Sequence, residues 1–139
     1  MNNADLLYKE LSYRLHGCFI EVRKNLGPGH KELVYENALV EEFNEKNISF
    51  EKEKNINIYS PKTGNVLGNY RVDFLVDNKI IVEIKAVDNI PRNFIDQIYS
   101  YLKNSEYELG YFVNFKSDKL YVKRIIYTNN RKIFAKCLV

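Results

Sequence analysis

The sequence is poor in several residues and patterns that mark particular protein classes. Its 139 residues include two cysteines, Cys18 and Cys137, and two histidines, so neither a disulfide framework nor a cysteine and histidine zinc site is expected. No apolar run approaches the ~20 residues that a transmembrane helix needs. The first ten residues, MNNADLLYKE, lack the pattern of a signal peptide. We therefore expect a cytoplasmic protein that does not enter the membrane.

The composition is that of a globular chain with an uneven charge distribution. Apolar residues make up 45% and charged residues 28%, and no linker or repeat is visible, which predicts a single domain over residues 1–139. Residues 111–139 carry a net charge of +6, and residues 1–110 carry −3. The basic residues of the C-terminal part are Lys116, Lys119, Lys123, Arg124, Arg131, Lys132 and Lys136. This part is expected to contact nucleic-acid phosphates, or else to be a solubilising surface.

Apolar spacing and turn residues predict the order of the elements. Helices are expected over residues 4–26, 30–47 and about 91–104, the second with Gly29 as N-cap and Glu32 as its third residue. Strands are expected over residues 48–58, 66–76, 80–87, 107–115 and 120–127. The order ααβββαββ predicts an α/β fold with a mixed central sheet flanked by helices.

The stretch RVDFLVDNKIIVEIKAV, residues 71–87, combines two strands with charges inside them. A three-residue turn at 77–79, with Asn78 or Lys79 in the left-handed region, pairs residue 76 with 80 and residue 74 with 82. This register places the apolar residues, Val72 among them, on one common face. It gathers four charged residues on the other face: Arg71, Asp73, Glu83 and Lys85.

The predicted register sets two carboxylates, Asp73 and Glu83, directly opposite each other. Like charges in this position repel, and each raises the pKa of the other unless a cation lies between them. Arg71 and Lys85 are one source of positive charge, in a surface network of ion pairs. A divalent ion such as Mg²⁺ is the other, since it accepts one or two carboxylates and keeps its waters. The local chemistry leaves both explanations open.

Several motifs together resemble a known family. Asp73 followed by Glu83, Ile84 and Lys85 resembles the signature of the PD-(D/E)XK phosphodiesterase superfamily. GHKELVY, residues 29–35, is similar to the pattern that names the GxxExxY family within it. RVDFLV, VEIKAV and LGYFVNF follow in that family's order, so the resemblance covers about residues 11–127. One departure is Arg23, at a position where the family often has histidine.

The resemblance implies a restriction-endonuclease-like fold and a set of site residues. Asp73, Glu83 and the carbonyl of Ile84 are expected to bind Mg²⁺ or Mn²⁺, and Lys85 to stabilise charge on a phosphate. Glu32 is expected to assist through water, although a helix N-terminus favours an acid in any case. Gln97 is expected to orient the water or the lysine, and Tyr101 is expected in the core.

These expectations define one leading function and two alternatives. The leading one is a metal-dependent nuclease that hydrolyses phosphodiester bonds in nucleic acid, with DNA favoured over RNA. Arg71, Lys123 and Arg124 are the candidate nucleic-acid contacts, and Arg71 has an ion pair as its alternative. The same fold could instead bind nucleic acid or protein without chemistry. The third hypothesis is a homodimer built on the sheet edge.

Overall fold

The structure is a computed structural model that describes residues 7–137, with side chains through residue 135. Its elements are α1 (Lys9–Leu26), α2 (Glu32–Glu45), β1 (Phe50–Tyr59), β2 (Val66–Val76), β3 (Ile80–Lys85), α3 (Arg92–Lys103), β4 (Leu109–Asn114) and β5 (Tyr121–Ile126). Two short 3₁₀ helices, Asn129–Arg131 and Phe134–Cys137, follow β5 and were not predicted. The predicted order ααβββαββ is confirmed, and residues 4–6 of the first predicted helix lie outside the described part.

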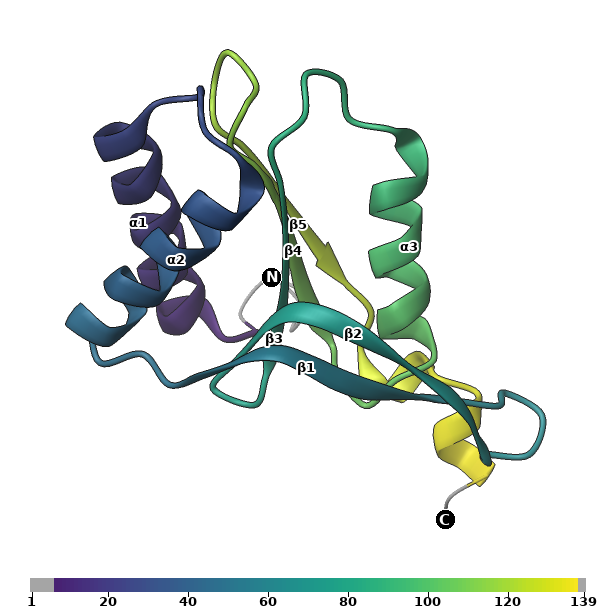
Figure 1. The fold of residues 1–139 in the computed structure, drawn as a ribbon. Coiled ribbons are helices and arrows are strands. Elements are labelled where there is room, and N and C mark those ends of the chain that lie inside the picture. The colour runs from purple at the N-terminus through teal and green to yellow at the C-terminus, as the bar shows by residue number, and fades with distance from the viewer. Residues whose placement is uncertain (1–6, 138–139) are drawn as a thin grey trace.

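The five strands form one mixed sheet in the order β1-β2-β3-β4-β5. β3 and β4 are parallel and the other pairs are antiparallel, which confirms the predicted mixed sheet. Helices α1 and α2 cover one face and α3 covers the other, while the long β1–β2 hairpin crosses the remaining strands (Figure 1). None of the helices within residues 7–137 is long and apolar enough to span a membrane.

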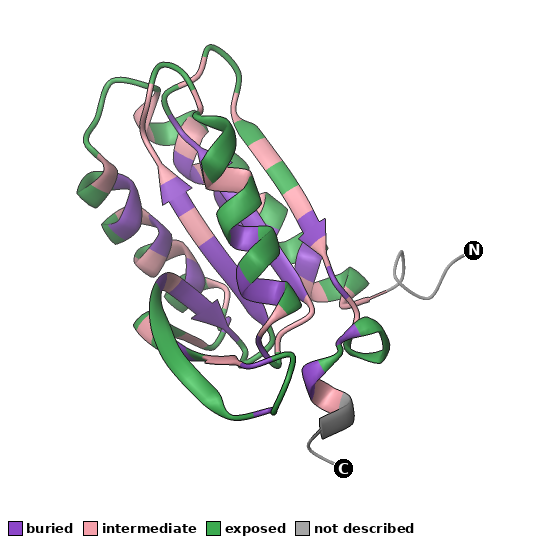
Figure 2. Ribbon diagram, turned by 90° about the vertical axis from the view of Figure 1, so that its right-hand side faces the viewer, coloured by how far each residue is buried: buried purple, intermediate pink, exposed green. Residues whose placement is uncertain are grey.

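Each face of the sheet carries its own apolar core. The first core joins α1 and α2 to the sheet through residues such as Leu15, Phe19, Leu39, Phe74 and Val82. The second joins α3 to the opposite face through residues such as Ile81, Ile98, Leu102 and Phe112. The centre of the sheet is accordingly buried, whereas residues 66–71 of β2, in the distal part of the β1–β2 hairpin, are exposed (Figure 2).

Helix α3 lies very close to β4 because a glycine faces it. A Cβ atom on Gly110 would lie only 2.9 Å from Cγ2 of Ile98, so a larger residue would push the helix away from the sheet. The close packing fixes the inward face of α3, on which Ile98, Tyr101 and Leu102 are buried. The prediction that Tyr101 belongs to the core is confirmed.

The start of α2 differs from the prediction. Lys31, with an extended backbone, is the N-cap, and Glu32 is the first helical residue, so the predicted N-cap at Gly29 is wrong. The hydroxyl of Tyr35 explains the difference, because it donates to the carbonyl of Gly27 and accepts the N–H of His30 at 3.2 Å. These bonds hold the loop between α1 and α2 away from helical geometry.

Not every apolar residue of the first two helices faces the core. Ile20 of α1 and Leu33 of α2 are 53% and 59% exposed, and Val34 is also exposed.

Arg23, at the position where a histidine was expected, links α1 to the β4–β5 turn by donating to the carbonyl of Asp118 at 3.0 Å.

The C-terminal segment is attached to the sheet by a buried lysine. Lys132 is 1% exposed, and its ammonium donates to the carbonyls of Ser105 at 2.7 Å and Tyr107 at 2.6 Å. Burial lowers the pKa of Lys132 to about 8, although the nearby charges of Glu108 and Glu106 oppose the shift. The expectation that Lys132 contacts nucleic-acid phosphates is therefore wrong.

Lys132→Ala should lower the free energy of unfolding by about 2 kcal/mol, because two buried carbonyls lose their donor. The folded protein holds fewer protons than the unfolded chain between the lowered pKa of about 8 and the ordinary 10.5. Lys132 should therefore contribute stability that increases with pH across this window, so the difference in free energy of unfolding between the unmodified protein and Lys132→Ala should increase as well. Urea titrations across the window measure both, with the exposed Lys119→Ala as control. Equal pH dependence of the two proteins would contradict this account.

Candidate active site

The two candidate carboxylates lie where β2 and β3 separate. The ladder between these strands contains three pairs, of which Phe74 with Val82 is the last. Beyond it, the N–H of Asp73 donates to Oε1 of Glu83 at 3.1 Å, and the N–H of Ile84 donates to Oδ2 of Asp73 at 2.8 Å. Carboxylate side chains thus replace backbone partners at this point of the sheet.

The predicted hairpin register is confirmed, with a correction in the turn. Val76 pairs with Ile80, and both Asp77 and Asn78 have positive φ angles, 50° and 54°. The prediction placed Asn78 or Lys79 in this region and missed Asp77. Lys79 instead closes the turn by donating its N–H to the carbonyl of Val76 at 2.9 Å.

The predicted alternation along β2 fails at Val72. Phe74 and Val76 belong to the core under α1 and α2, but Val72 belongs to the core under α3, together with Leu75. The change of face coincides with the end of the β2–β3 ladder and with Glu53 on β1, whose φ of 55° interrupts regular strand geometry.

The two carboxyl groups share a half-buried, negatively charged environment. Burial raises the pKa of Glu83 to about 9, and the charge of Asp73 adds to the rise. Burial also raises the pKa of Asp73, although its bond from the N–H of Ile84 opposes the shift. Near neutral pH the pair therefore retains a proton that either group alone in water would have lost.

The surface network of ion pairs is not formed around these acids. Among the described residues, neither Asp73 nor Glu83 has a cationic side chain within 4.0 Å, and Arg71 pairs with Glu53 at 3.1 Å. The ammonium of Lys85 lies 5.1 Å from the ring centroid of Phe94. Arg71 therefore forms an ion pair with Glu53, one of the two roles that the sequence left open for it.

Lys85 is held in place by the end of the neighbouring strand. Asn114 pairs with Lys85 in the parallel β3–β4 ladder and is fully buried. Its side chain accepts the N–H of Val87 at 3.1 Å and donates to the carbonyl of Val87 at 2.9 Å. The N–H of Phe115 donates to the carbonyl of Lys85 at 2.9 Å. Asn114 is a positioning residue that sequence reasoning missed.

Helix α2 adds two acids to the neighbourhood of Asp73. Burial raises the pKa of Glu32, the charge of Lys85 opposes the rise, and the charge of Asp73 adds to it. Glu32 therefore lies within electrostatic reach of Lys85 and Asp73. Burial and the charge of Asp73 raise the pKa of Glu36, which is 8% exposed. Sequence reasoning missed Glu36, although its spacing of four residues from Glu32 places both on one helix face.

Two residues of α3 relate differently to the site. Burial raises the pKa of Tyr101 to about 12, and the charge of the nearby Glu83 adds to the rise. Gln97, one helical turn earlier, is exposed. Its expected role in orienting water therefore stays a prediction.

The two basic residues of β5 lie on opposite faces of the sheet. Lys123 is exposed and pairs with Phe112, which in turn pairs with Glu83, so all three occupy one row on the α3 face. Arg124 points to the other face and donates to the carbonyl of Leu7 at 3.0 Å. They cannot form the single contact surface that the sequence predicted.

The comparison with protein families agrees with this geometry. The sequence matches the PD-(D/E)XK nuclease superfamily over residues 9–125, which include Asp73, Glu83 and Lys85. The chain belongs to this superfamily. No curated protein and no solved structure matches it. The restriction-endonuclease-like α/β fold is thereby confirmed.

In this PD-(D/E)XK domain without metal, Asp73→Asn should leave the free energy of unfolding unchanged or raise it by up to about 1 kcal/mol, because carboxylate repulsion disappears. Between the ordinary 4.5 and about 9, folded Glu83 keeps a proton that the unfolded chain has lost. Stability should therefore fall as pH rises through this window, and less steeply in Asp73→Asn.

Urea titrations in EDTA at several pH values measure this effect. Asp96→Asn, an exposed substitution on α3, is the matched control and should follow the unmodified protein. A marked loss of stability in Asp73→Asn alone would show that Asp73 acts mainly as the acceptor for the N–H of Ile84.

Proposed function

We propose that the protein is a metal-dependent nuclease of the GxxExxY type, which hydrolyses phosphodiester bonds in nucleic acid, with DNA favoured over RNA. The observation that carries the proposal is the contact of Asp73 with Glu83 beside Lys85. Membership of the PD-(D/E)XK nuclease superfamily supports the reaction class.

The donor set fits a hard divalent cation such as Mg²⁺ or Mn²⁺. Within residues 7–137, no three His, Cys, Asp or Glu side chains gather as a metal-binding group, so the protein supplies few ligands. Mg²⁺ is commonly held by one or two carboxylates and retains waters. Asp73 and Glu83, with the carbonyl of Ile84, would hold it. When bound, such an ion supplies Lewis-acid stabilisation of phosphate oxygens and a more acidic water.

The pKa of Glu83 has a consequence for metal affinity. Carboxylate ligands must be ionised, and the pair holds a proton at neutral pH because burial and the charge of Asp73 raise the pKa of Glu83 to about 9. Cation binding must therefore release a proton. Affinity should increase with pH up to this value.

The other residues act on the phosphate or on protons. Lys85, whose backbone is fixed by the strand end at Asn114, has its ammonium within electrostatic reach of the acids, where it would stabilise negative charge that develops on the phosphate. Glu32, which is half-buried, and Glu36, which is buried, are acids of raised pKa near Asp73, suited to accept a proton from water. Gln97 of α3 would orient that water.

Nucleic acid would lie across the α3 face of the sheet. Lys123 occupies the same row as Glu83, two strands away, which corresponds to roughly 10 Å. It is suited to a backbone phosphate next to the scissile one. Arg71 remains a contact candidate only if its exposed pair with Glu53 opens.

The homodimer hypothesis has weaker support. β1 is the edge strand next to β2, and its residues 51–54 are four successive charges, of which Glu51, Lys52 and Glu53 are exposed. Charges of this kind discourage pairing between sheet edges. We therefore treat the single chain as the unit that binds nucleic acid.

Lys85→Ala should lower Mg²⁺-dependent cleavage by roughly 10²-fold or more, because one group that stabilises the transition state is lost. Folding and metal binding should persist. Lys85→Arg should not restore the rate, since a planar guanidinium does not replace a compact ammonium. Cleavage of single- and double-stranded DNA and of RNA by the three proteins measures this, with EDTA as control. If the unmodified protein cleaves nothing with any divalent metal, or if Lys85→Ala cleaves equally well, the interpretation as a silent binding module replaces the nuclease.

Lys123→Gln should weaken binding of duplex DNA and reduce the slope of log affinity against log salt by about 0.9, the value expected for one lost phosphate contact. Lys103→Gln, at the far end of α3, should leave both unchanged. Filter-binding or anisotropy titrations over a range of salt concentrations provide the slopes. Identical slopes for Lys123→Gln and the unmodified protein would place the phosphate contacts elsewhere.

A further inference from the structure

An exposed tyrosine lies near the candidate acids on β2. Tyr70 is 49% exposed and precedes Asp73 by three residues, which corresponds to roughly 10 Å along a strand. It pairs with Ile56 of β1, and Ile56 belongs to the apolar core under α3. Cross-strand partners point to the same face of a sheet, so Tyr70 lies on the α3 face, as Glu83 does.

One face of the Tyr70 ring is covered and the other is open. The ring packs against that of Tyr101 on α3, with centroids 4.7 Å apart and an angle of 31° between the planes. A contact of this geometry covers one face of each ring, so the exposed surface of Tyr70 includes the opposite face. Gly68 is the next residue of β2 on this side toward the hairpin tip, and a Cβ atom placed on it would contact nothing within 4 Å. Space for another planar group therefore remains beside the ring.

Tyr101 connects the exposed ring to the two acids. It is 7% exposed, and its pKa is raised to about 12 by burial first and then by the charges of Glu83, Tyr70 and Asp73. Tyr101 thus lies within electrostatic reach of both acids and in ring contact with Tyr70. Figure 1 shows a matching arrangement, because β2 passes the C-terminal end of α3. A phosphate at the acids would therefore have an aromatic surface next to it.

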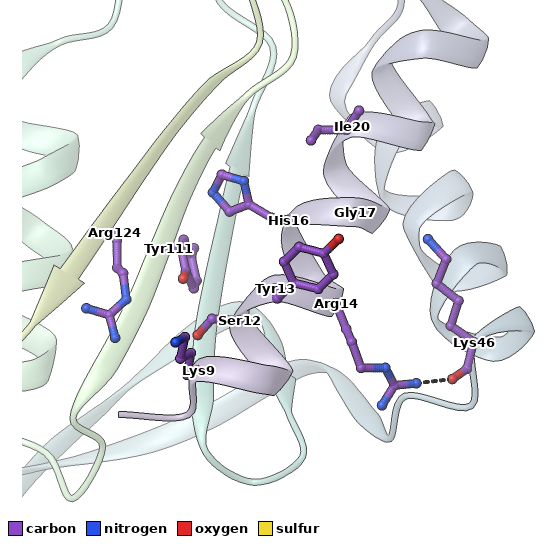
Figure 3. A pocket seen from close by; sticks show the side chains of 10 residues that line it. All are labelled: Lys9, Ser12, Tyr13, Arg14, His16, Gly17, Ile20, Lys46, Tyr111 and Arg124. Carbon is purple, nitrogen blue, oxygen red and sulfur yellow. Dashed lines mark hydrogen bonds between the residues drawn. The ribbon is translucent and has the colours of Figure 1, made fainter. Parts of the chain in front are cut away.

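Exposure alone does not distinguish Tyr70, because single exposed aromatic side chains are common on protein surfaces. Tyr13 is more exposed, at 81%, but it lies on α1 and lines a cavity whose lining includes neither of the two acids (Figure 3). Tyr70 differs in its stacked neighbour and in the closeness of that neighbour to Glu83. Its position, and not its exposure, indicates a role in substrate binding.

An exposed aromatic ring beside a phosphate site suits an unpaired base. Every base has an aromatic face, and proteins that bind single strands stack bases on aromatic side chains. The bases of a duplex already pair and stack on their neighbours, so they reach such a ring only after unpairing, at a cost in free energy. Tyr70 therefore favours a single strand over a duplex.

We propose that the candidate active site takes single-stranded nucleic acid, with an unpaired base beside the scissile phosphate stacked on Tyr70. The base forms the third ring of a stack that continues through Tyr70 to Tyr101. This preference rests on the proposed nuclease function and narrows its substrate class. Tyr70 determines specificity through the stacking contact and takes no part in bond cleavage. A closed duplex keeps only contacts with phosphates, such as that of Lys123.

Fluorescence anisotropy with labelled oligonucleotides of about 12 nucleotides tests the proposal. All proteins carry Lys85→Ala and are titrated with Mg²⁺ present, so the metal site can be occupied while the oligonucleotide stays intact. A thymidine single strand should bind more tightly than a duplex of the same length whose ends are closed by ethylene-glycol linkers. Tyr70→Leu should weaken binding of the single strand about tenfold, the scale of one lost base stack, and should leave binding of the closed duplex unchanged.

Two further variants separate the ring from other effects of the substitution. Tyr70→Leu keeps an apolar contact with Tyr101 but lacks the planar ring, whereas Tyr70→Phe keeps the ring and should bind like the parent protein. Tyr13→Leu makes the same change on α1, which covers the opposite face of the sheet, and should also bind like the parent. Thermal melting checks that each variant is folded.

An oligonucleotide of the same length with abasic sites throughout separates base stacking from phosphate contacts. It should bind the parent protein about tenfold more weakly than the thymidine strand, because it retains the phosphates and lacks the bases. Tyr70→Leu should cause no further loss with this ligand, because the two changes remove the same contact. The comparison of the two strands uses only the parent protein, so it decides the question even if Tyr70→Leu does not fold.

Undiminished binding of the thymidine strand by Tyr70→Leu, an equal loss with the abasic strand, or tighter binding of the closed duplex would each overturn the preference for single strands, whatever the cleavage assay shows. A protein that loses affinity through Tyr70→Leu but cleaves no nucleic acid with any divalent metal would contradict the nuclease function alone. Affinity and cleavage thus test the two proposals separately.

Discussion

The reciprocal contact between Asp73 and Glu83 is the constraint on which this structure depends. The β2–β3 ladder stops at Phe74 and Val82, and the next two backbone N–H groups are satisfied by carboxylates instead of carbonyls. This arrangement lets the strands separate without leaving buried donors unpaired. It also places two acids side by side in a half-buried position, where burial raises the pKa of both and repulsion between them favours a shared proton or a bound cation.

The rest of the fold holds three other elements against this point. Asn114 fixes the chain directly after Lys85 by bonding both backbone groups of Val87. Gly110 allows α3 to approach the sheet closely enough for Tyr101 to lie near Glu83. The ring of Tyr35 stacks on that of Phe115, with centroids 4.6 Å apart, and its hydroxyl holds the preceding loop so that α2 begins at Glu32. Glu32 and Glu36 thereby lie near Asp73. The apolar cores therefore determine where the acids meet.

Sequence patterns were sufficient for the order of elements and for the register that opposes Asp73 to Glu83. That register follows from one requirement, a common face for Phe74, Val76, Ile80 and Val82, and periodicity reports this directly. Hydrophobic periodicity could not predict that β2 changes face at Val72, because the change coincides with the end of the β2–β3 pairing, which only the folded structure shows. Glu36 was missed for a related reason: its burial results from tertiary packing, and only its spacing from Glu32 hinted at it.

The C-terminal charge cluster shows why composition does not define a surface. Lys132 is basic in sequence but buried as a structural donor to two carbonyls. Lys123 and Arg124 are adjacent, yet strand alternation directs Lys123 to the face of the carboxylates and Arg124 to the face covered by α1, where it donates to the carbonyl of Leu7. Alternation along β5 thus divides one basic run between the two faces of the sheet. The number and sign of the charges in a run of sequence therefore do not show which of them share a surface.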